Sequence, residues 1–242
     1  MPSRESPNML QLSSVQAGYE EKIVLNGVSL TVGNSEIVGL VGPNGSGKST
    51  VLKSIFGLVK VSSGEILYQE TKIQNRKSHL NVATGICYVP QGSKVFDKLT
   101  VQENLEMGGT LLKDRKLLQQ RVDEMYEWYP KLKNYQKKLA GRLSGGERQM
   151  VGLCIGMIMN PRLLLIDEPS IGLAPTLVAS TLELISRIRE SFQTSVLIVE
   201  QNVRALLTIA DRIYLLKLGE IVFEEKTLER DTEQKLRGLF LQ

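Results

Sequence analysis

The stretch GPNGSGKST, residues 42–50, matches the phosphate-loop pattern G-x-x-x-x-G-K-[ST]. An apolar run, EIVGLVG (36–42), precedes it, and KSTVLKSIFGL (48–58) continues it with apolar residues at helical spacing. Glycines let the backbone curl so that successive N–H groups face one anion, and the positive end of the helix points at the same place. A strand, a glycine-rich turn and a helix in this order predict a nucleotide-phosphate site rather than a chance glycine-rich turn.

The last residues of this loop have separate expected roles. The Lys48 ammonium is expected to reach the terminal phosphates, the Ser49 hydroxyl to hold Mg²⁺, and Thr50 to add a further phosphate contact. The residues predicted to bind the nucleotide here are Gly42, Pro43, Asn44, Gly45, Ser46, Gly47, Lys48, Ser49 and Thr50.

Two adjacent carboxylates follow the apolar run in LLLIDEP, residues 163–169. A continuous apolar run is typical of a buried parallel strand, so Asp167 and Glu168 are expected at its carboxyl end. Asp167 is predicted to hold Mg²⁺, and Glu168 to act as the general base that polarises the attacking water. The alternative, an acidic turn that caps the next helix, is less favoured because a phosphate loop lies upstream.

A second glycine-containing motif, LSGGERQM (143–150), opens an apolar helical segment. Ser144 and Glu147 have the spacing of a capping box, which predicts a helix N-terminus. A helix N-terminus with a serine hydroxyl and bare glycine amides is also suited to bind an anion. The motif therefore has a purely structural interpretation and a functional one, and the two are compatible.

The composition is that of an ordinary globular protein, with 242 residues, 42% of them hydrophobic, and a net charge of +4. The mild positive charge fits an anionic ligand or a membrane surface. Basic and acidic residues are interspersed, so no nucleic-acid partner is expected. Cys87 and Cys154 lie in apolar contexts and are predicted to be buried free thiols. His79, the sole histidine, is expected on the surface in a loop or edge.

The three motifs in this order resemble those of the ATP-binding-cassette (ABC) ATPases, the motor subunits of transporters. The resemblance covers about residues 9–242 and implies an α/β P-loop NTPase fold, with a RecA-like core, an antiparallel β subdomain and an inserted helical subdomain. The core is expected at about 9–91 and 160–242, the charged helical insertion at about 92–159, and a flexible tail at 1–8. In that family the LSGGE signature binds the γ-phosphate of ATP held by the partner subunit. The residues matched are Ser144, Gly145, Gly146 and Glu147.

Smaller motifs carry further roles over from the resemblance. Tyr19 matches the aromatic residue that stacks on adenine, although a tyrosine at a strand end is the alternative. Gln91 in YVPQ matches the glutamine that touches Mg²⁺ and the attacking water. SIGLAP (170–175) matches the loop that crosses the dimer interface, with Ala174 where most relatives have aspartate. Gln201 in VEQN holds the position of the usual switch histidine and is expected to be a working γ-phosphate sensor.

The GLAP and VEQN pair is similar to one branch, the ATPases of branched-chain amino-acid uptake systems. This resemblance implies an ATP- and Mg²⁺-dependent ATPase at the cytoplasmic face of the inner (plasma) membrane. It implies a head-to-tail dimer with a second ABC ATPase, a heterodimer in the transporter, together with two transmembrane permease subunits and a solute-binding protein. Ile155 departs from the branch, because relatives usually have arginine there; burial in the core is the interpretation given to it.

Three alternatives stay open at this level. The first is a related ABC system for urea or amide uptake or for lipid export, since closely related motors serve several solutes. The second is a non-hydrolysing ATP-binding module, in which Gln201 and Ala174 mark a degenerate site. The third is an ATPase of DNA repair or chromosome structure, which is disfavoured because the chain has neither heptad repeats nor cysteine pairs.

Overall fold

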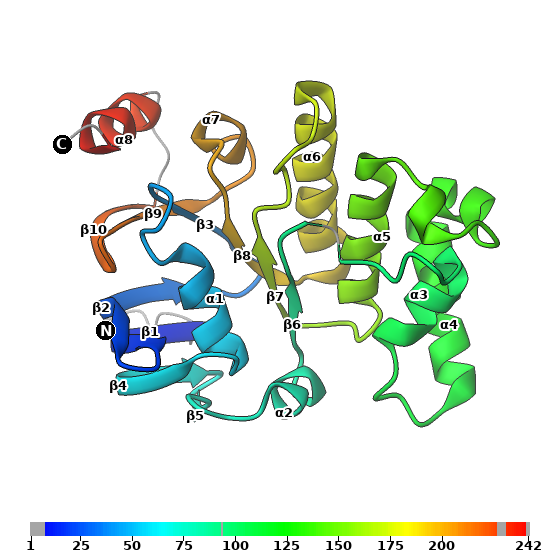
Figure 1. Cartoon of the computed structure of the whole chain (residues 1–242), viewed down its shortest axis with the longest axis horizontal. Coiled ribbons are helices and arrows are strands. Elements are labelled where there is room, and N and C mark those ends of the chain that lie inside the picture. The colour runs from blue at the N-terminus through cyan, green and yellow to red at the C-terminus, as the bar shows by residue number, and fades with distance from the viewer. Residues whose placement is uncertain (1–7, 93, 227–230, 241–242) are drawn as a thin grey trace, which may run out of the picture.

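The computed structural model describes residues 8–92, 94–226 and 231–240, and it contains two sheets (Figure 1). The smaller sheet is antiparallel and has the strand order β2-β1-β4-β5. Its strands are β1 (Leu10–Tyr19), β2 (Lys22–Val32), β4 (Lys60–Tyr68) and β5 (Thr71–Lys72). This sheet is the antiparallel subdomain that the sequence predicts.

The larger sheet has the order β10-β9-β3-β8-β7-β6, and only the β9–β10 pair is antiparallel within the described residues. Its strands are β3 (Ile37–Val41), β6 (Ile86–Val89), β7 (Leu163–Asp167), β8 (Ser195–Val199), β9 (Arg212–Lys217) and β10 (Glu220–Glu225). Because β3, β7 and β8 are parallel neighbours, their carboxyl ends meet at one edge, where the phosphate loop and the two carboxylates follow.

Helices cover both faces of the larger sheet. The helices are α1 (Lys48–Phe56), α2 (Ser78–Ala83), α3 (Val101–Gly108), α4 (Arg115–Trp128), α5 (Gly145–Met157), α6 (Pro175–Phe192), α7 (Val203–Leu206) and α8 (Thr232–Phe240), with 3₁₀ turns η1 (Pro130–Tyr135) and η2 (Ala140–Arg142). The segment between β6 and β7 is helical and forms one end of the molecule in Figure 1. Its predicted limits, about residues 92 and 159, stay predictions.

Alternating side chains of the central strands enter two different cores. In β7, Leu164 and Ile166 pack with α5, α6 and the helical segment, whereas Leu163 and Leu165 pack toward α1 and the antiparallel sheet. A strand buried on both faces is uniformly apolar, which explains the run LLLI. Helix α1 thus lies between the two sheets (Figure 1). Its buried side chains Val51, Leu52 and Ile55 anchor the helix that follows the phosphate loop.

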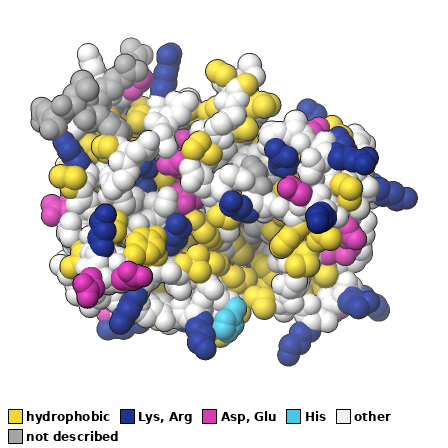
Figure 2. Space-filling model, in the orientation of Figure 1, with side chains coloured by type: hydrophobic (Ala, Val, Ile, Leu, Met, Phe, Trp, Pro, Cys, Tyr) yellow, Lys and Arg dark blue, Asp and Glu magenta, His cyan; other side chains and the backbone are white. Residues whose placement is uncertain are grey.

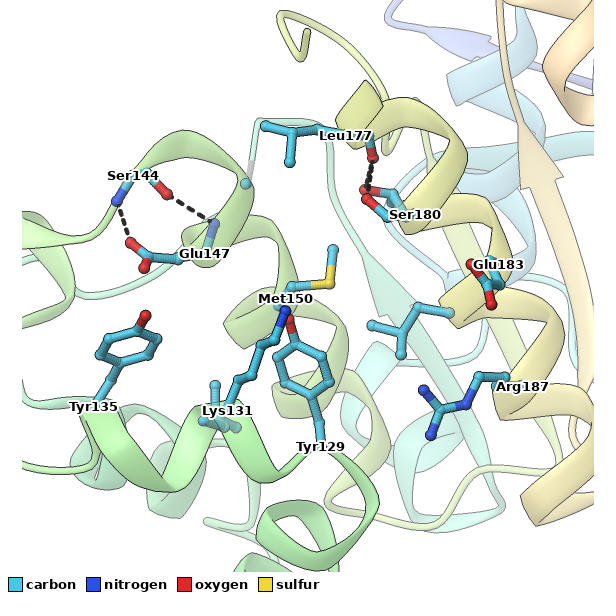
Figure 3. A pocket seen from close by; sticks show the side chains of 14 residues that line it. Tyr129, Lys131, Tyr135, Ser144, Glu147, Met150, Leu177, Ser180, Glu183 and Arg187 are labelled. Carbon is cyan, nitrogen blue, oxygen red and sulfur yellow. Dashed lines mark hydrogen bonds between the residues drawn. The ribbon is translucent and has the colours of Figure 1, made fainter. Parts of the chain in front are cut away.

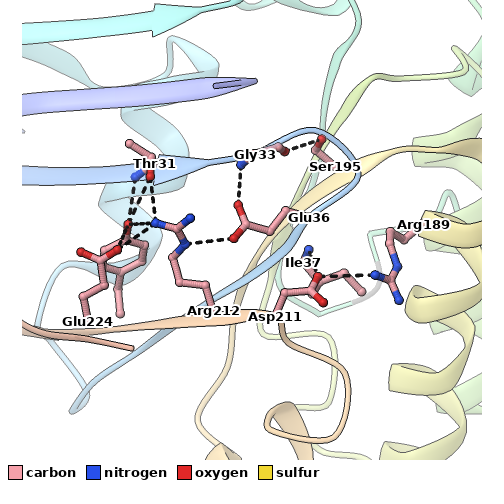
Figure 4. A network of polar contacts seen from close by, with 10 residues as sticks. Thr31, Gly33, Glu36, Ile37, Arg189, Ser195, Asp211, Arg212 and Glu224 are labelled. Carbon is pink, nitrogen blue, oxygen red and sulfur yellow. Dashed lines mark hydrogen bonds and ion pairs between the residues drawn. The ribbon is translucent and has the colours of Figure 1, made fainter. Parts of the chain in front are cut away.

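A polar cluster joins the two sheets near their shared side (Figure 4). The Arg212 guanidinium on β9 contacts Glu36 Oε1 at 2.9 Å, Glu224 Oε1 at 2.8 Å and Thr31 Oγ1 at 3.1 Å. The Tyr214 hydroxyl donates to Glu224 Oε1 at 2.9 Å and accepts the Thr31 backbone N–H. Since Thr31 lies on β2 and the others on or beside β3, β9 and β10, this cluster ties the antiparallel sheet to the larger one.

The predicted α/β fold class is confirmed, with three local differences. The sequence does not predict β5, α2, α7 or α8. His79 is exposed as expected, but it lies on the short helix α2 and not in a loop or edge. Ile155 is only partly buried, so the core interpretation is incomplete. Cys87 and Cys154 are buried free thiols, as predicted, and burial raises the pKa of each to about 12. Of the predicted tail, residues 1–7 lie outside the described residues.

No helix in the described part of the chain combines the length and the apolar character that crossing a bilayer requires.

Candidate functional site

The phosphate loop joins β3 to α1 in a conformation that needs glycine. Gly45 and Gly47 have φ values of 80° and 106°, in the region that side chains rarely adopt. A Cβ at Gly47 would also lie 2.9 Å from the Leu25 Cδ2 atom. Gly47 is the N-cap of α1, and no described side chain hydrogen-bonds to the free N–H groups of that helix end. The first turn of α1 is therefore open to an external anion.

Lys48 is a buried cation at this helix end, with 5% of its surface exposed. Its Nζ donates to the carbonyls of Gly42 and Pro43, each at 2.9 Å, and lies 4.0 Å from Glu168 Oε1. Burial lowers the pKa of Lys48, and the nearby Glu168 and Asp167 carboxylates oppose that shift. A buried cation is stabilised by a further anionic partner, and a phosphate group can be that partner.

Asp167, at the end of β7, accepts hydrogen bonds from two hydroxyl groups. Ser49 Oγ donates to Asp167 Oδ1 at 2.9 Å, and the Tyr88 hydroxyl donates to Oδ2 at 2.9 Å. Burial raises the pKa of Tyr88, and the Asp167 carboxylate raises it further. The sequence motifs did not single out Tyr88. Its position on β6, three residues before Gln91, is a signal that could have identified it.

Glu168 sits in a strained backbone conformation beside two amide donors. Its φ is 45°, an unusual value for a residue with a side chain, and its N–H donates to the Val199 carbonyl at 2.9 Å. Oε2 accepts the Nε2 groups of Gln91 at 2.8 Å and Gln201 at 2.9 Å. The carboxylate is thus held by side chains from two loops, those after β6 and β8, and its Oε1 lies toward Lys48 at the start of α1.

A cavity of about 340 Å³ connects these residues to the predicted adenine contact. Tyr19 lines it and is 46% exposed, so one face of its ring is available for stacking. The Ser46 hydroxyl beside the cavity is buried with no hydrogen-bond partner among the described residues. The lining residues are Tyr19, Lys22, Val24, Asn44, Gly45, Gly47, Lys48, Ser49, Thr50 and Glu168. The open helix end, the buried cation and the exposed ring together fit a nucleoside triphosphate.

The signature residues lie elsewhere, at the N-terminus of α5. Ser144 is the N-cap, its Oγ accepts the Glu147 N–H at 3.3 Å, and its own N–H donates to Glu147 Oε2 at 2.7 Å. This capping box confirms the structural interpretation of LSGGE. The Ser144 backbone hydrogen bond lowers the pKa of Glu147, and bonds from Tyr135 and Ser144 side chains add to that. Gly145 is exposed, while Gly146 is buried beside Leu177 of α6.

A second cavity, of about 360 Å³, opens beside this helix end (Figure 3). Tyr129, Lys131 and Tyr135 line it from the η1 side, and Glu183 and Arg187 line it from α6. No described residue lines both this cavity and the phosphate-loop cavity. The structure therefore brings Tyr19, the phosphate loop and Glu168 around one cavity. Asp167 hydrogen-bonds to Ser49 of that loop, and Gln91 and Gln201 hydrogen-bond to Glu168. The signature residues Ser144, Gly145, Gly146 and Glu147 do not line this cavity.

The sequence of residues 25–171 matches the ABC transporter family. The chain is 37% identical to the probable branched-chain amino acid transport ATP-binding protein LivF of Archaeoglobus fulgidus, covering 94% of this chain and 98% of that one. It is 39% identical to the high-affinity branched-chain amino acid transport ATP-binding protein BraG of Pseudomonas aeruginosa, covering 96% and 99%. It is 35% identical to the lipopolysaccharide export system ATP-binding protein LptB of Haemophilus influenzae, covering 97% of each chain.

A solved structure agrees with these relationships. The dimeric post-hydrolysis state of an ATP-binding cassette bound to ADP and Pi is 27% identical and superposes with a TM-score of 0.79, covering 91% of this chain and all of that one. The fold and the phosphate site define a P-loop NTPase.

The chain belongs to the ABC transporter family. Its ATP-binding subunits are ATPases that bind nucleotide, work as dimers with transmembrane permeases and associate peripherally with membranes.

Proposed function

We propose that this chain is the ATP-hydrolysing motor subunit of an importer for branched-chain or other neutral amino acids. Two relatives above 35% identity carry that transport role in their names, and both align over nearly their full length. The role places the chain at the cytoplasmic face of the inner membrane. A solute-binding protein then delivers the solute, and selectivity lies in that protein and in the permeases.

One observation carries the proposal of hydrolysis: the Glu168 carboxylate is held by Gln91 and Gln201 at the edge of the phosphate-loop cavity. A general base must be fixed within reach of the water that it activates. Two amide donors on Oε2 fix the carboxylate and leave Oε1 toward the cavity. Gln201 supplies one of these donors without a titrating group, so loss of the usual histidine does not leave Glu168 unsupported.

The residues proposed for Mg²⁺ are Ser49, Asp167 and Gln91, and their oxygen donors suit that ion. Ser49 Oγ and Asp167 Oδ1 already lie 2.9 Å apart, whereas the Gln91 amide points at Glu168. Mg²⁺ held by these residues would neutralise charge on the phosphates. The contribution of this chain is to orient the Asp167 carboxylate through the Ser49 and Tyr88 hydroxyls.

The separation of the two cavities supports a head-to-tail dimer. The phosphate-loop cavity offers a cation and open amides, while the signature end lies at a different cavity of the same chain. We propose that each nucleotide is bound by the phosphate loop of one chain and by Ser144, Gly145, Gly146 and Glu147 of the other, and that the other chain is a second, different ATPase. Ile171, 46% exposed in the SIGLAP loop, belongs to that interface.

An apolar groove supports docking of a permease segment. It is hollowed between the core and the helical segment, where Figure 2 shows hydrophobic side chains gathered. Its walls include Phe56, Val89 and Ile155. Exposed Phe96 and Met107 lie within two residues of Lys94 and Gly108, which also line it. Ile155 in place of the usual arginine keeps this wall apolar. Pro90 lines the groove, and the next residue, Gln91, donates to Glu168 Oε2.

One alternative keeps a specific observation in its favour. The LptB relative, at 35% identity, serves lipopolysaccharide export, so a lipid-export motor is the second candidate. Amino-acid uptake is preferred because the LivF and BraG relatives have higher identity and the GLAP and VEQN motifs match that branch.

The decisive test of hydrolysis is Glu168→Gln in the assembled transporter. The variant removes the base but keeps the shape and hydrogen bonding of the side chain. We expect ATP binding within about twofold of wild type and hydrolysis at this site about 10²–10⁴-fold slower, with a dimer that stays closed on ATP. Glu190→Gln, an exposed carboxylate in the last turn of α6 that lines neither cavity, is the matched control and is expected to keep normal turnover. Normal turnover of Glu168→Gln would refute the base assignment.

A further inference from the structure

Glu200 is a buried carboxylate that the proposed chemistry does not use. It follows directly after β8 and is 1% exposed. Its Oε1 accepts the backbone N–H of Ser170 at 2.9 Å. Its Oε2 accepts the backbone N–H groups of Gln201 at 2.9 Å and Asn202 at 3.3 Å. The Glu200 N–H donates to the Leu40 carbonyl of β3 at 3.3 Å, so both its main chain and its side chain are anchored.

These contacts join the two loops that hold the base and its amide donor. Ser170 lies two residues after Glu168, and Gln201 is the residue after Glu200. Because Gln201 Nε2 also donates to Glu168 Oε2 at 2.9 Å, the contacts close a ring that runs through both loops. The ring fixes where the Gln201 amide meets the Glu168 carboxylate.

An ionised carboxylate is chemically suited to this place. It accepts at both oxygens, so it satisfies N–H donors from the loop after β7 and from the loop after β8 together. A glutamine has the same shape, but its NH₂ group would face backbone N–H groups on one side. One of the two loops would then lose its acceptor, and a buried N–H would be left unpaired.

The backbone of Glu168 shows why such a tie is needed. Its φ of 45° is unfavourable for a residue with a side chain, and conformations of this kind persist where surrounding contacts hold them. The Val199 carbonyl holds the Glu168 N–H, and Glu200 holds the N–H of Ser170 immediately beyond Pro169. The same Ser170 begins the loop 170–175 that is proposed to meet the partner chain.

We propose that Glu200 is a positioning residue for hydrolysis: it places Gln201 against Glu168 and ties both to the proposed interface loop. This inference rests on the proposed function, in which Glu168 is the general base. Glu200 is buried, does not line the phosphate-loop cavity and acts through Gln201.

The test is a double-mutant cycle between Glu200→Gln and Gln201→Ala, measured as kcat and KM for ATP in the assembled transporter. We expect each single variant to lower kcat about tenfold with KM within about twofold of wild type. The double variant is expected within about twofold of Gln201→Ala alone, because Glu200 acts through that side chain. Losses that multiply to about a hundredfold, full kcat in Glu200→Gln, or a loss confined to KM would each overturn the proposal.

Two further variants separate positioning from stability. Glu36→Gln removes a partly buried carboxylate, which accepts a hydrogen bond from Arg212 and lies outside the ring, and is expected to lower Tm but not kcat. If Glu200→Gln does not fold, Glu200→Asp keeps the charge with a shorter reach and is expected to lower kcat about threefold in the same cycle. Failure of both Glu200 variants to fold would assign Glu200 to the fold and overturn the proposal.

Glu168→Gln in the same assay keeps the two claims apart. If Glu168→Gln retains turnover, the proposed base is wrong. If Glu168→Gln is inactive while Glu200→Gln keeps full kcat, only the role of Glu200 is wrong.

Discussion

Two helix N-termini in this chain carry glycine-rich motifs suited to anions, and they are built differently. Helix α1 begins after Gly47 in a left-handed conformation, with no side-chain cap from the described residues and with Lys48 at its first position. Helix α5 begins at Ser144 with a complete capping box, so the Glu147 carboxylate occupies the N-cap N–H. One end is open and positively charged; the other is closed by its own acid.

This difference suggests that α1 binds phosphate within one chain and that α5 completes the site of a partner chain. The first amides of α1 have no hydrogen-bond partner among the described residues, and Lys48 lines the cavity there, so we expect this chain to bind phosphate at that end without a partner chain. At α5 the capping box already satisfies the Ser144 and Glu147 N–H groups, so an anion can add contacts only to the groups that the box leaves free, such as the Ser144 hydroxyl proton and the exposed Gly145 amide. We therefore expect the first end to set the affinity for ATP, and the second to contribute only when a partner chain presents its nucleotide.

The substitution expected to have the largest effect on the difference between the two helix ends is Lys48→Ala. Loss of the buried ammonium removes a charge-assisted contact of about 1.5–3 kcal/mol, so the Kd for ATP of the isolated chain is expected to rise about 10–100-fold. Lys53→Ala on the same helix is the control, since Lys53 does not line the cavity. Calorimetric titration of ATP into each variant measures the effect, and an unchanged Kd for Lys48→Ala contradicts an affinity set at α1.

A smaller effect is expected from substitution of Gln201, which contacts Glu168 beside the α1 site. Gln201→Ala removes one of the two amide donors on Glu168 Oε2 and is expected to slow turnover about tenfold with ATP affinity unchanged. Gln201→His restores a donor and is expected to keep turnover within about threefold of wild type. Phosphate release by the assembled transporter measures both variants. Full turnover of Gln201→Ala would show that Glu168 is held well enough without this donor.

The smallest effect concerns the closed end, through Glu147→Gln. Glutamine keeps the capping geometry but loses the charge. The pKa of Glu147 is lowered in the folded chain, so its charged form stabilises the fold above its ordinary pKa of 4.5, and that stability is lost as pH falls through the lowered pKa. Near pH 7 we expect the variant to have a Tm about 1–3 °C lower than wild type, with the difference shrinking as the pH falls below 4.5. A difference that grows on acidification contradicts this assignment.

Much of the phosphate site could be predicted because its residues act locally. GPNGSGKST specifies its own turn and the helix after it, and LLLIDEP places two carboxylates at a strand end through strand burial alone. The capping box of LSGGE was predictable for the same reason, since Ser144 and Glu147 are three residues apart. In each case the signal and the structure lie within one short segment.

The missed contacts depend on the order of strands in the sheet. Tyr88 reaches Asp167 only because β6 and β7 are neighbours, and Glu200 reaches Ser170 only because β8 lies on the other side of β7. A sequence shows neither pairing. Gln201 was expected to sense the γ-phosphate; in the structure its amide contacts Glu168, and the phosphate contact stays a prediction.

Gly145→Asp separates ATP binding, which is expected to need only α1 of this chain, from turnover, which is expected to need α5 and a partner chain. A Cβ at Gly145 approaches only Leu173 Cδ2, at 4.0 Å, among the described residues, and an acid in the first turn favours the helix itself. The same charge repels a partner's phosphate. We predict an ATP Kd for the isolated variant within about twofold of wild type, and transporter turnover reduced to about half or less, because a dimer keeps at most one intact site. Unchanged turnover, or a loss of ATP affinity as large as that of Lys48→Ala, would contradict the account.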